Sequence, residues 1–180
     1  ALLKSPHLAH VRTLLLHGNY PMHVEGTVAF AKEPALARIE HLYLQSGGDE
    51  GLTALADSPY VHNLQTLAMG SHNNVTDKGV KALARSSNLN SLYSLHLSHN
   101  DVSDEGAKAL AEKTGLPKLR DLNLARNNIG TSGALALAQG SALEGLRHLR
   151  FAWVDRKQLG TTGVTALTDR FGIHFETPFV

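Results

Sequence analysis

The chain alternates between two kinds of hydrophobic pattern, of which the first is a short core of three apolar residues. In each core the second and third apolar residues follow the first after three and five positions. Around the second apolar residue the sequence shows the two-residue period of a short strand with one buried face. We therefore predict a run of parallel strands, centred near Leu14, Leu42, Leu67, Leu95, Leu122 and Leu149.

The second pattern follows each strand core and begins at a glycine, with an alanine three positions later and then an apolar and a small residue. Apolar and small positions recur there at spacings of three and four, which is typical of a helix with one buried face. Hydroxyl or acidic residues such as Thr76 and Ser103 precede each glycine and suit the free N–H groups of a helix start. A helix is predicted near each of Gly26, Gly51, Gly79, Gly106, Gly133 and Gly163.

The two patterns together form a repeat, because the central leucines are 28, 25, 28, 27 and 27 residues apart. One unit of strand, turn and helix cannot bury its own apolar face, so the units must stack. We expect a single domain over residues 1–180, with a partial repeat at 1–7, six repeats over 8–172 and a closing cap at 173–180. The chain starts within a repeat and without methionine, so we expect it to be a fragment of a larger protein.

These repeats resemble a known family. The run from Leu95 to Ala111 has Leu97, Asn100 and Val102 at the positions of a leucine-rich repeat of the ribonuclease-inhibitor-like type. The resemblance implies an α/β fold, a right-handed leucine-rich-repeat solenoid or horseshoe, with a parallel sheet on the concave face and helices on the convex face. It also implies that the turn asparagines point inward and hydrogen-bond the backbone of adjacent turns.

Some repeats depart from the family pattern in the turn. Asn19, Asn100 and Asn127 occupy the asparagine position, whereas Asn73 falls one residue late. The second repeat is three residues short and has no asparagine, and the sixth has Val154 in its place. In the second and sixth repeats we expect altered turns rather than lost strands.

Composition and charge narrow the classes of function. The formal net charge is +1, so no overall field draws the protein to nucleic acid or to an anionic membrane. Apolar runs are far shorter than the roughly 20 residues that cross a bilayer. The chain has no cysteine, which fits a reducing compartment and excludes a thiolate metal site. We expect a cytoplasmic protein with no cofactor, no nucleic-acid partner and no membrane partner.

Eleven histidines raise the possibility of a metal or catalytic site. The nearest approach to a cluster is His96, His99 and His148. His96 is predicted on the concave face and His99 in the turn beyond it, which is poor geometry for one metal ion. Candidate nucleophiles such as Ser98 occupy positions that merely tolerate polar residues. We predict no metal ligand and no catalytic residue, so the chain is not expected to be an enzyme.

The concave face carries the candidate binding residues. A structural repeat needs no particular residue beside its central leucine, so large or charged residues there indicate binding, unless they simply cover the sheet as ordinary surface. Aromatic residues and arginine are enriched at interface hot spots. The predicted partner-binding residues are His41, Tyr43, His96, Asn123, Arg126, His148, Arg150 and Trp153.

The leading hypothesis is a protein-interaction scaffold, the recognition part of a larger protein that binds a protein partner on its concave face. The repeats resemble those of environmental bacterial proteins. An alternative is the substrate-recognition arm of an effector-type ubiquitin ligase or another multidomain enzyme. Residues 133–136 resemble the signature of one plant-pathogen effector group, although the repeats of that group are shorter. The identity of the partner, the face that binds it and the oligomeric state stay open.

Overall fold

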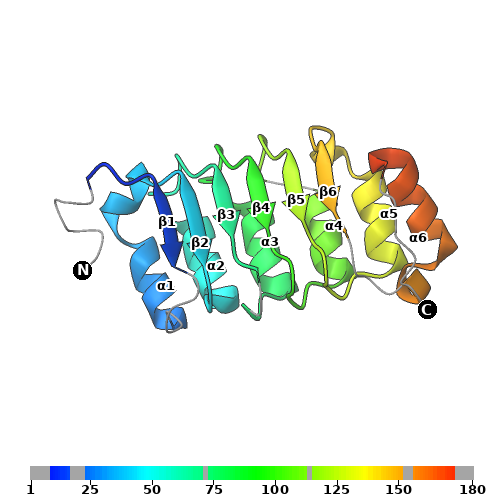
Figure 1. The fold of residues 1–180 in the computed structure, drawn as a ribbon, viewed down its shortest axis with the longest axis horizontal. Coiled ribbons are helices and arrows are strands. Elements are labelled where there is room, and N and C mark those ends of the chain that lie inside the picture. Colours follow the sequence, from blue (N-terminus) through cyan, green and yellow to red (C-terminus); the bar gives the residue numbers. More distant parts are fainter. Residues whose placement is uncertain (1–8, 17–22, 71–72, 113–114, 152–155, 173–180) are drawn as a thin grey trace.

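The computed structural model describes residues 9–16, 23–70, 73–112, 115–151 and 156–172, in which strands and helices alternate (Figure 1). The strands are β1 (Thr13–Leu16), β2 (His41–Leu44), β3 (Thr66–Ala68), β4 (Ser94–His96), β5 (Asp121–Asn123) and β6 (His148–Arg150). The helices are α1 (Val24–Ala31), α2 (Gly48–Asp57), α3 (Asp77–Arg85), α4 (Asp104–Glu112), α5 (Thr131–Gln139) and α6 (Arg156–Phe171). Two short 3-10 helices, η3 (Pro34–Arg38) and η4 (Ser141–Leu143), precede β2 and β6.

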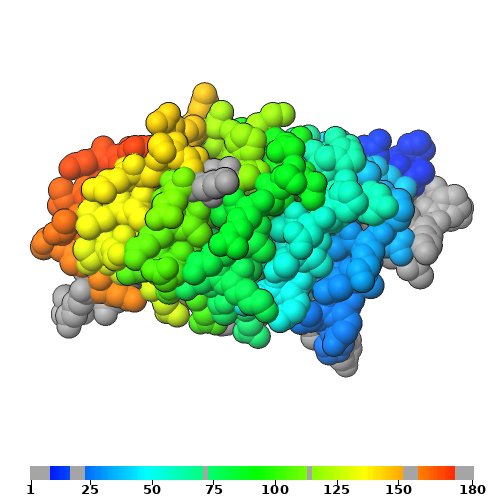
Figure 2. Space-filling model, turned by 180° about the vertical axis from the view of Figure 1, so that it is seen from behind, coloured from blue at the N-terminus to red at the C-terminus, as the bar shows by residue number. Residues whose placement is uncertain are grey.

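The strands form one parallel sheet in the order β1-β2-β3-β4-β5-β6. Its register pairs each central leucine with the next, from Leu14 with Leu42 through to Leu122 with Leu149. All helices lie on one side of the sheet (Figure 1). Seen from that side, the sequence colours form successive bands along the molecule, so each repeat packs against its neighbours (Figure 2). The predicted strand centres, their parallel order and the α/β solenoid are confirmed.

The core lies between the sheet and the helices. The central leucines of β2 to β5 are buried, and so is the apolar residue two positions after each of them, such as Leu97. The helices contribute a second buried layer that includes Leu83 and Leu110. Small buried side chains such as Ala84 and Ala111 let neighbouring helices pack closely. The helix glycines lie in the first turn of α1 to α5, as predicted.

Buried asparagines link the turns of successive repeats. Asn100 Oδ1 accepts a hydrogen bond from Val75 N at 3.1 Å, and Asn100 Nδ2 donates to Met69 O at 2.8 Å. Asn127 makes the equivalent bond with Val102 N at 3.0 Å. Each amide satisfies backbone groups that burial removes from water, which would otherwise cost free energy. The inward orientation that the family resemblance implies is therefore present.

Asn73 takes part in the same ladder although it lies one residue late in its repeat. Its Oδ1 accepts from Gly47 N at 3.0 Å, and its Nδ2 donates to Gly70 O at 2.6 Å. The second repeat has no asparagine, and its short turn passes through Ser46 and Gly48 at positive φ values of 73° and 58°. Because β2 is retained, the expectation of an altered turn with an intact strand is confirmed for this repeat.

Several sequence predictions fall outside the described residues. They are the partial repeat at 1–7, the cap at 173–180, Asn19 in the first repeat and the turn of the sixth repeat around Val154. After that turn, α6 is interrupted at Gly160, which adopts φ 60° and ψ 172°.

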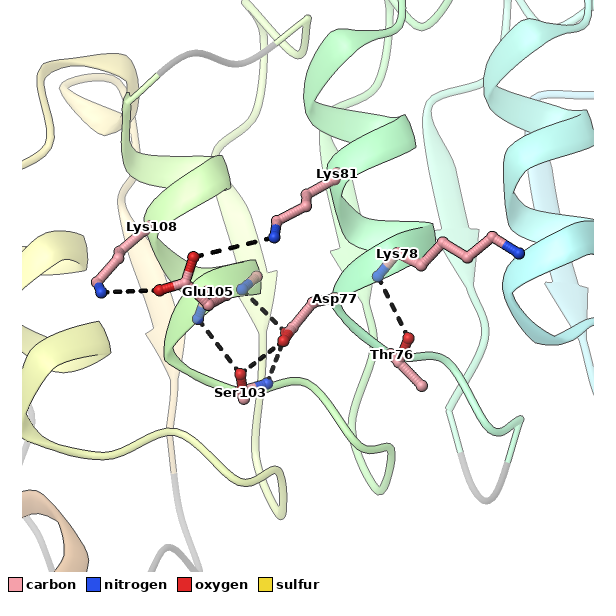
Figure 3. Close-up of polar contacts among 8 residues, drawn as sticks. Thr76, Asp77, Lys78, Lys81, Ser103, Glu105 and Lys108 are labelled. Atoms are coloured by element: carbon pink, nitrogen blue, oxygen red, sulfur yellow. Dashed lines mark hydrogen bonds and ion pairs between the residues drawn. The ribbon is translucent and has the colours of Figure 1, made fainter.

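A second ladder joins the helix starts of successive repeats (Figure 3). Asp77, at the start of α3, accepts hydrogen bonds from Ser103 N at 2.8 Å, Ser103 Oγ at 2.6 Å and Gly106 N at 2.9 Å. Ser103 Oγ in turn accepts from Glu105 N at 3.3 Å, within its own repeat. The N-terminus of α4 is thus capped both by its own serine and by an aspartate of the preceding repeat.

The same link joins the preceding pair of helices and, with fewer bonds, the following pair. Asp49 accepts from Thr76 N at 2.8 Å, Thr76 Oγ1 at 2.6 Å and Gly79 N at 2.9 Å. Asp104 accepts from Gly130 N at 2.6 Å. The sequence predicts that the hydroxyl and acidic residues cap their own helices, and it does not reveal this bond between repeats.

The aspartates also explain the helix glycines. A Cβ atom on Gly106 would lie 2.6 Å from Asp77 Oδ1 and 2.7 Å from Val102 Cγ1. A Cβ atom on Gly79 would lie 2.6 Å from Asp49 Oδ1. The glycine therefore leaves room for the carboxylate of the preceding repeat, in addition to marking the helix start.

Candidate partner-binding face

The sheet surface that faces away from the helices is here called the strand face, and it is the face predicted to be concave. Two rows of side chains cross it, one on each side of the buried central leucines. The first row is Thr13, His41, Thr66, Ser94, Asp121 and His148. The second row is Leu15, Tyr43, Ala68, His96, Asn123 and Arg150. Neighbours within a row are about 4.8 Å apart, so each row presents a continuous surface.

A third row, the leading row, immediately precedes the first and is not predicted by the sequence pattern. Its backbone carbonyls continue the sheet, since Arg120 O accepts from Arg147 N at 2.8 Å and His148 N at 2.9 Å. The apolar residues on both sides of the leading and first rows, such as Leu119 and Leu122, are buried, so the residues between them face outward. The leading row is Arg12, Glu40, Gln65, Tyr93, Arg120 and Arg147.

Over β1 to β4 the three rows include apolar and aromatic side chains among polar ones. Leu15 is 53% exposed and pairs in register with Tyr43, which is half-buried. Tyr93 is 46% exposed, and among the described residues Leu15 and Tyr93 are the large hydrophobic side chains exposed to solvent. Arg12 and Glu40 form an ion pair at 3.6 Å, so their charges cancel locally. We call Leu15, Tyr43 and Tyr93 the apolar half of the strand face.

Over β5 and β6 the same rows are basic. Arg147 and Arg150 are exposed, and Arg120 is half-buried with its Nη1 donating to Leu119 O at 2.9 Å. Asp121 is the acidic residue of the rows here, and its Oδ1 lies 2.5 Å from His148 Nδ1. Between residues 115 and 151 the sequence has five basic and two acidic residues, whereas residues 9–68 have three basic and six acidic. We call Arg120, Arg147 and Arg150 the basic half.

His96 lies at the boundary between the two halves. Its Nε2 is 3.1 Å from Ser94 Oγ. Partial burial, and then the positive charge of Arg150, lower the pKa of His96 below its ordinary value, while Asp121 opposes this with a smaller effect. At neutral pH the imidazole is therefore uncharged and can both donate and accept a hydrogen bond.

The structure brings six of the predicted binding residues together on the strand face, and they are His41, Tyr43, His96, Asn123, His148 and Arg150. His41 Nδ1 lies 3.0 Å from Thr66 Oγ1, so it is held within the first row. Arg126 is exposed in the turn after β5, where its φ is 54°. Trp153 lies outside the described residues.

Three other features find no support in the described part of the chain. It contains no group of three or more histidine, aspartate or glutamate side chains arranged to hold a metal ion. None of its helices is both long enough and apolar enough to cross a bilayer. A recess between α5 and α6 is lined by Leu135, threonines such as Thr162, and Asp169, and it gathers no set of catalytic groups.

Comparison with known proteins identifies the repeats. The family model described as "Leucine Rich repeat" matches residues 62–84, 88–111 and 115–138. Each matched segment holds one strand and the helix that follows it, from β3 to α5. The chain contains leucine-rich repeats over these residues. No curated protein sequence matches the chain.

Solved structures share the fold of this chain. The C-terminal domain of a tropomodulin from Caenorhabditis elegans aligns with a TM-score of 0.61 and 11% sequence identity, over 83% of this chain and 91% of that domain. Leiomodin-1 Actin-Binding Site 2 aligns with a TM-score of 0.57 and 17% identity, over 84% of this chain and 90% of that one. At these identities the likeness shows the fold alone.

Proposed function

We propose that the protein is a non-enzymatic interaction scaffold that binds a protein partner on its strand face. The observation that carries this proposal is the exposure of Leu15 and Tyr93 on the same face as the exposed Arg147 and Arg150. Leu15 also pairs in register with the half-buried Tyr43, and apolar side chains grouped on a folded surface are typical of an interaction site. The actin-binding leiomodin-1 domain has the same fold, which supports a protein as the class of partner. A cytoplasmic location, a bacterial origin and fragment status stay predictions.

The composition of the strand face suits protein recognition. Tyrosine and arginine provide large contact areas, and their truncation at a hot spot typically costs more than about 2 kcal/mol of binding free energy. The rows hold these side chains on paired strands, so little backbone conformational entropy is lost when a partner binds. The proposed contact residues are the predicted ones, supplemented by Leu15, Tyr93, Arg120 and Arg147 from the described rows.

The proposal is tested by affinity capture from the native lysate with the parent protein and two variants. Tyr43→Ala/Arg150→Ala removes one large side chain from each half of the strand face. Lys108→Ala is the control, because Lys108 lies on α4 and its Nζ pairs with Glu105 on the helix side of the molecule. We expect the double variant to lose a partner that the parent and the control retain. Loss only in the control would place the interface on the helices and overturn the proposal.

A further inference from the structure

On the strand face, the exposed arginines are not balanced by carboxylates. Among the described residues, no carboxylate forms an ion pair with Arg120, Arg147 or Arg150. The nearby carboxylate of Asp121 is already engaged by His148 Nδ1 at 2.5 Å. In the other half of the face, Arg12 is matched by Glu40 at 3.6 Å. The basic half therefore presents guanidinium groups that no carboxylate of the described residues neutralises.

An arginine guanidinium matches the geometry of a carboxylate and can bind it through two parallel hydrogen bonds. Leu119 O holds Arg120 Nη1 at 2.9 Å, which orients this guanidinium at the edge of the basic half. In the second row, His96 and Asn123 lie between Tyr43 and Arg150. Basic charge that no carboxylate pairs with thus lies over β5 and β6, whereas over β1 and β2 Arg12 and Glu40 pair with each other.

Resting on the proposed function, we propose that the bound partner segment is an extended stretch of protein that is acidic at one end and apolar at the other. Its carboxylates lie over Arg120, Arg147 and Arg150, and its apolar side chains lie over Leu15, Tyr43 and Tyr93. The segment crosses the strands rather than running along them, because the two halves are separated along the direction from β1 to β6.

The dimensions of the face set the length of this segment. Five spacings of about 4.8 Å separate β1 from β6, which gives a width of about 24 Å. An extended chain advances about 3.3 Å per residue, so about seven or eight residues cross the sheet. A short linear segment is therefore sufficient to contact both halves at once.

Nucleic acid fits the same surface less well. A nucleic acid carries a charge on every nucleotide, so a protein that binds it usually presents basic residues along the whole path of the backbone. Here Glu40 and the exposed Leu15 and Tyr93 occupy the path over β1 to β4. The surface therefore favours a ligand whose negative charge is confined to one end.

The test uses fluorescence anisotropy with a fluorescein-labelled peptide that has a block of glutamates followed by a block of leucine and phenylalanine. Three further probes are a peptide of the same composition with glutamate and apolar residues alternating, a block peptide with lysine in place of glutamate, and an oligothymidylate. We expect the block peptide to bind several-fold more tightly than the alternating peptide, and the lysine peptide and the oligothymidylate to bind more weakly than either.

Two double variants test the contributions of the basic half and the apolar half to peptide binding separately. Arg147→Glu/Arg150→Glu should weaken binding of the block peptide by roughly tenfold or more, since it replaces attraction by repulsion. It should also reverse the dependence on salt that the parent shows between about 0.1 M and about 1 M, where the screening length falls from about 10 Å to about 3 Å, because added salt then screens a repulsion. Leu15→Ser/Tyr93→Ser should weaken binding as well but leave the salt dependence in place.

Lys32→Glu/Arg85→Glu is the matched control, because it makes the same change in net charge. Lys32 caps the end of α1, Arg85 ends α3, and both are exposed. This control should leave the dissociation constant of the block peptide within about twofold of the parent value, a change of less than about 0.5 kcal/mol. An equal loss of binding in this control would mean that net charge alone attracts the peptide, and would overturn the inference. Thermal melts followed by circular dichroism confirm that each variant is folded.

The remaining outcomes distinguish this inference from the proposed function. The inference of an acidic segment would be overturned by any of three results. The lysine peptide could bind as tightly as the glutamate block peptide, oligothymidylate could bind more tightly than it, or neither glutamate peptide could bind. Capture of the native partner then decides the proposed function. If capture is lost in Leu15→Ser/Tyr93→Ser but unchanged in Arg147→Glu/Arg150→Glu, the proposed function stands without the acidic segment. If both double variants capture the partner as the parent does, both proposals fall.

Discussion

The Asp77 carboxylate of one repeat binds Ser103 of the next, accepting from its backbone N at 2.8 Å and from its Oγ at 2.6 Å. The two residues lie 26 positions apart in the sequence, at the starts of α3 and α4. Because a helix N-terminus has free N–H groups and a partial positive charge, a carboxylate from outside the helix stabilises it. The repeats are therefore joined by specific polar links as well as by their apolar core.

Asp77→Ala should destabilise the protein by about 1–3 kcal/mol, because it leaves the N–H groups of Ser103 and Gly106 without their acceptor. The free energy of unfolding is measured by urea titration. Asp101→Ala is the control, since Asp101 is an exposed aspartate close to the same turn and should change stability by less than about 0.5 kcal/mol. Equal effects of the two substitutions would show that the link between repeats contributes nothing.

Gly106→Ala should also destabilise, although alanine has the higher helix propensity by about 1 kcal/mol. The added methyl group would lie 2.6 Å from Asp77 Oδ1 and 2.7 Å from Val102 Cγ1, so the carboxylate must move. We expect a net loss of about 1–3 kcal/mol in the same urea titration. In Asp77→Ala/Gly106→Ala one of the two clashes is absent, so the combined loss should be smaller than the sum of the single losses. An additive double variant would contradict this explanation of the glycine.

Leu97→Ala should cost about 2–5 kcal/mol, because Leu97 is fully buried behind the sheet and its truncation leaves a cavity. Leu15→Ala is a matched control on another strand segment, since Leu15 points to solvent and is 53% exposed. The control should change the free energy of unfolding by less than about 0.5 kcal/mol. Similar thermal melts for the two variants would mean that the inward and outward positions of the strands are wrongly assigned.

The free energy of unfolding should decrease at acidic pH, partly because the pKa of His96 is lowered in the folded protein. Its pKa in the folded protein is lowered by burial and by Arg150, below the value of about 6.5 of an unfolded chain. Between these two pKa values the unfolded state binds more protons, so the contribution of His96 is complete above pH of about 6.5 and declines as the pH falls through the folded pKa. His96→Gln should reduce this decline when urea titrations are compared across the pH range.

Arg150→Ala provides a direct check on the cause of this shift. Removal of the positive charge should raise the pKa of His96, while desolvation by burial continues to hold it down. The pKa is measured by NMR titration of the His96 ring protons. Arg85→Ala removes the same charge from the exposed end of α3 and should leave the pKa of His96 unchanged. An unchanged pKa in Arg150→Ala would contradict the electrostatic assignment.

The strand register could be predicted from the sequence because burial repeats at fixed positions, such as Leu95 and Leu122, and a parallel stack aligns them. The inward turn of Asn100 followed from the family resemblance. The role of Asp77 could not be predicted from the sequence, because its hydrogen-bond partners lie in another repeat and come close to it only when the repeats stack. A search for polar residues that recur at the same repeat position would have found Asp49, Asp77 and Asp104 together.

The leading row could not be predicted for a different reason. Strict strand alternation assigns Arg120 to the same side as Leu122, which is the buried side. In the structure Leu119 is buried as well, so the chain bends between them and Arg120 and Asp121 both face outward. The candidate binding surface is therefore wider than the alternating pattern indicates, and it gains Tyr93, Arg120 and Arg147.

The aspartate link has a direction, because the acceptor always belongs to the earlier repeat and the donors to the later one. A repeat of this kind therefore carries an acceptor for the following repeat and donors for the preceding one. A duplicated copy of residues 77–103, inserted in frame after Ser103, would bring its own carboxylate for the next helix and its own serine for the previous carboxylate. The number of repeats can change by internal duplication without a broken junction, and the strand face would lengthen by one strand spacing of about 4.8 Å each time.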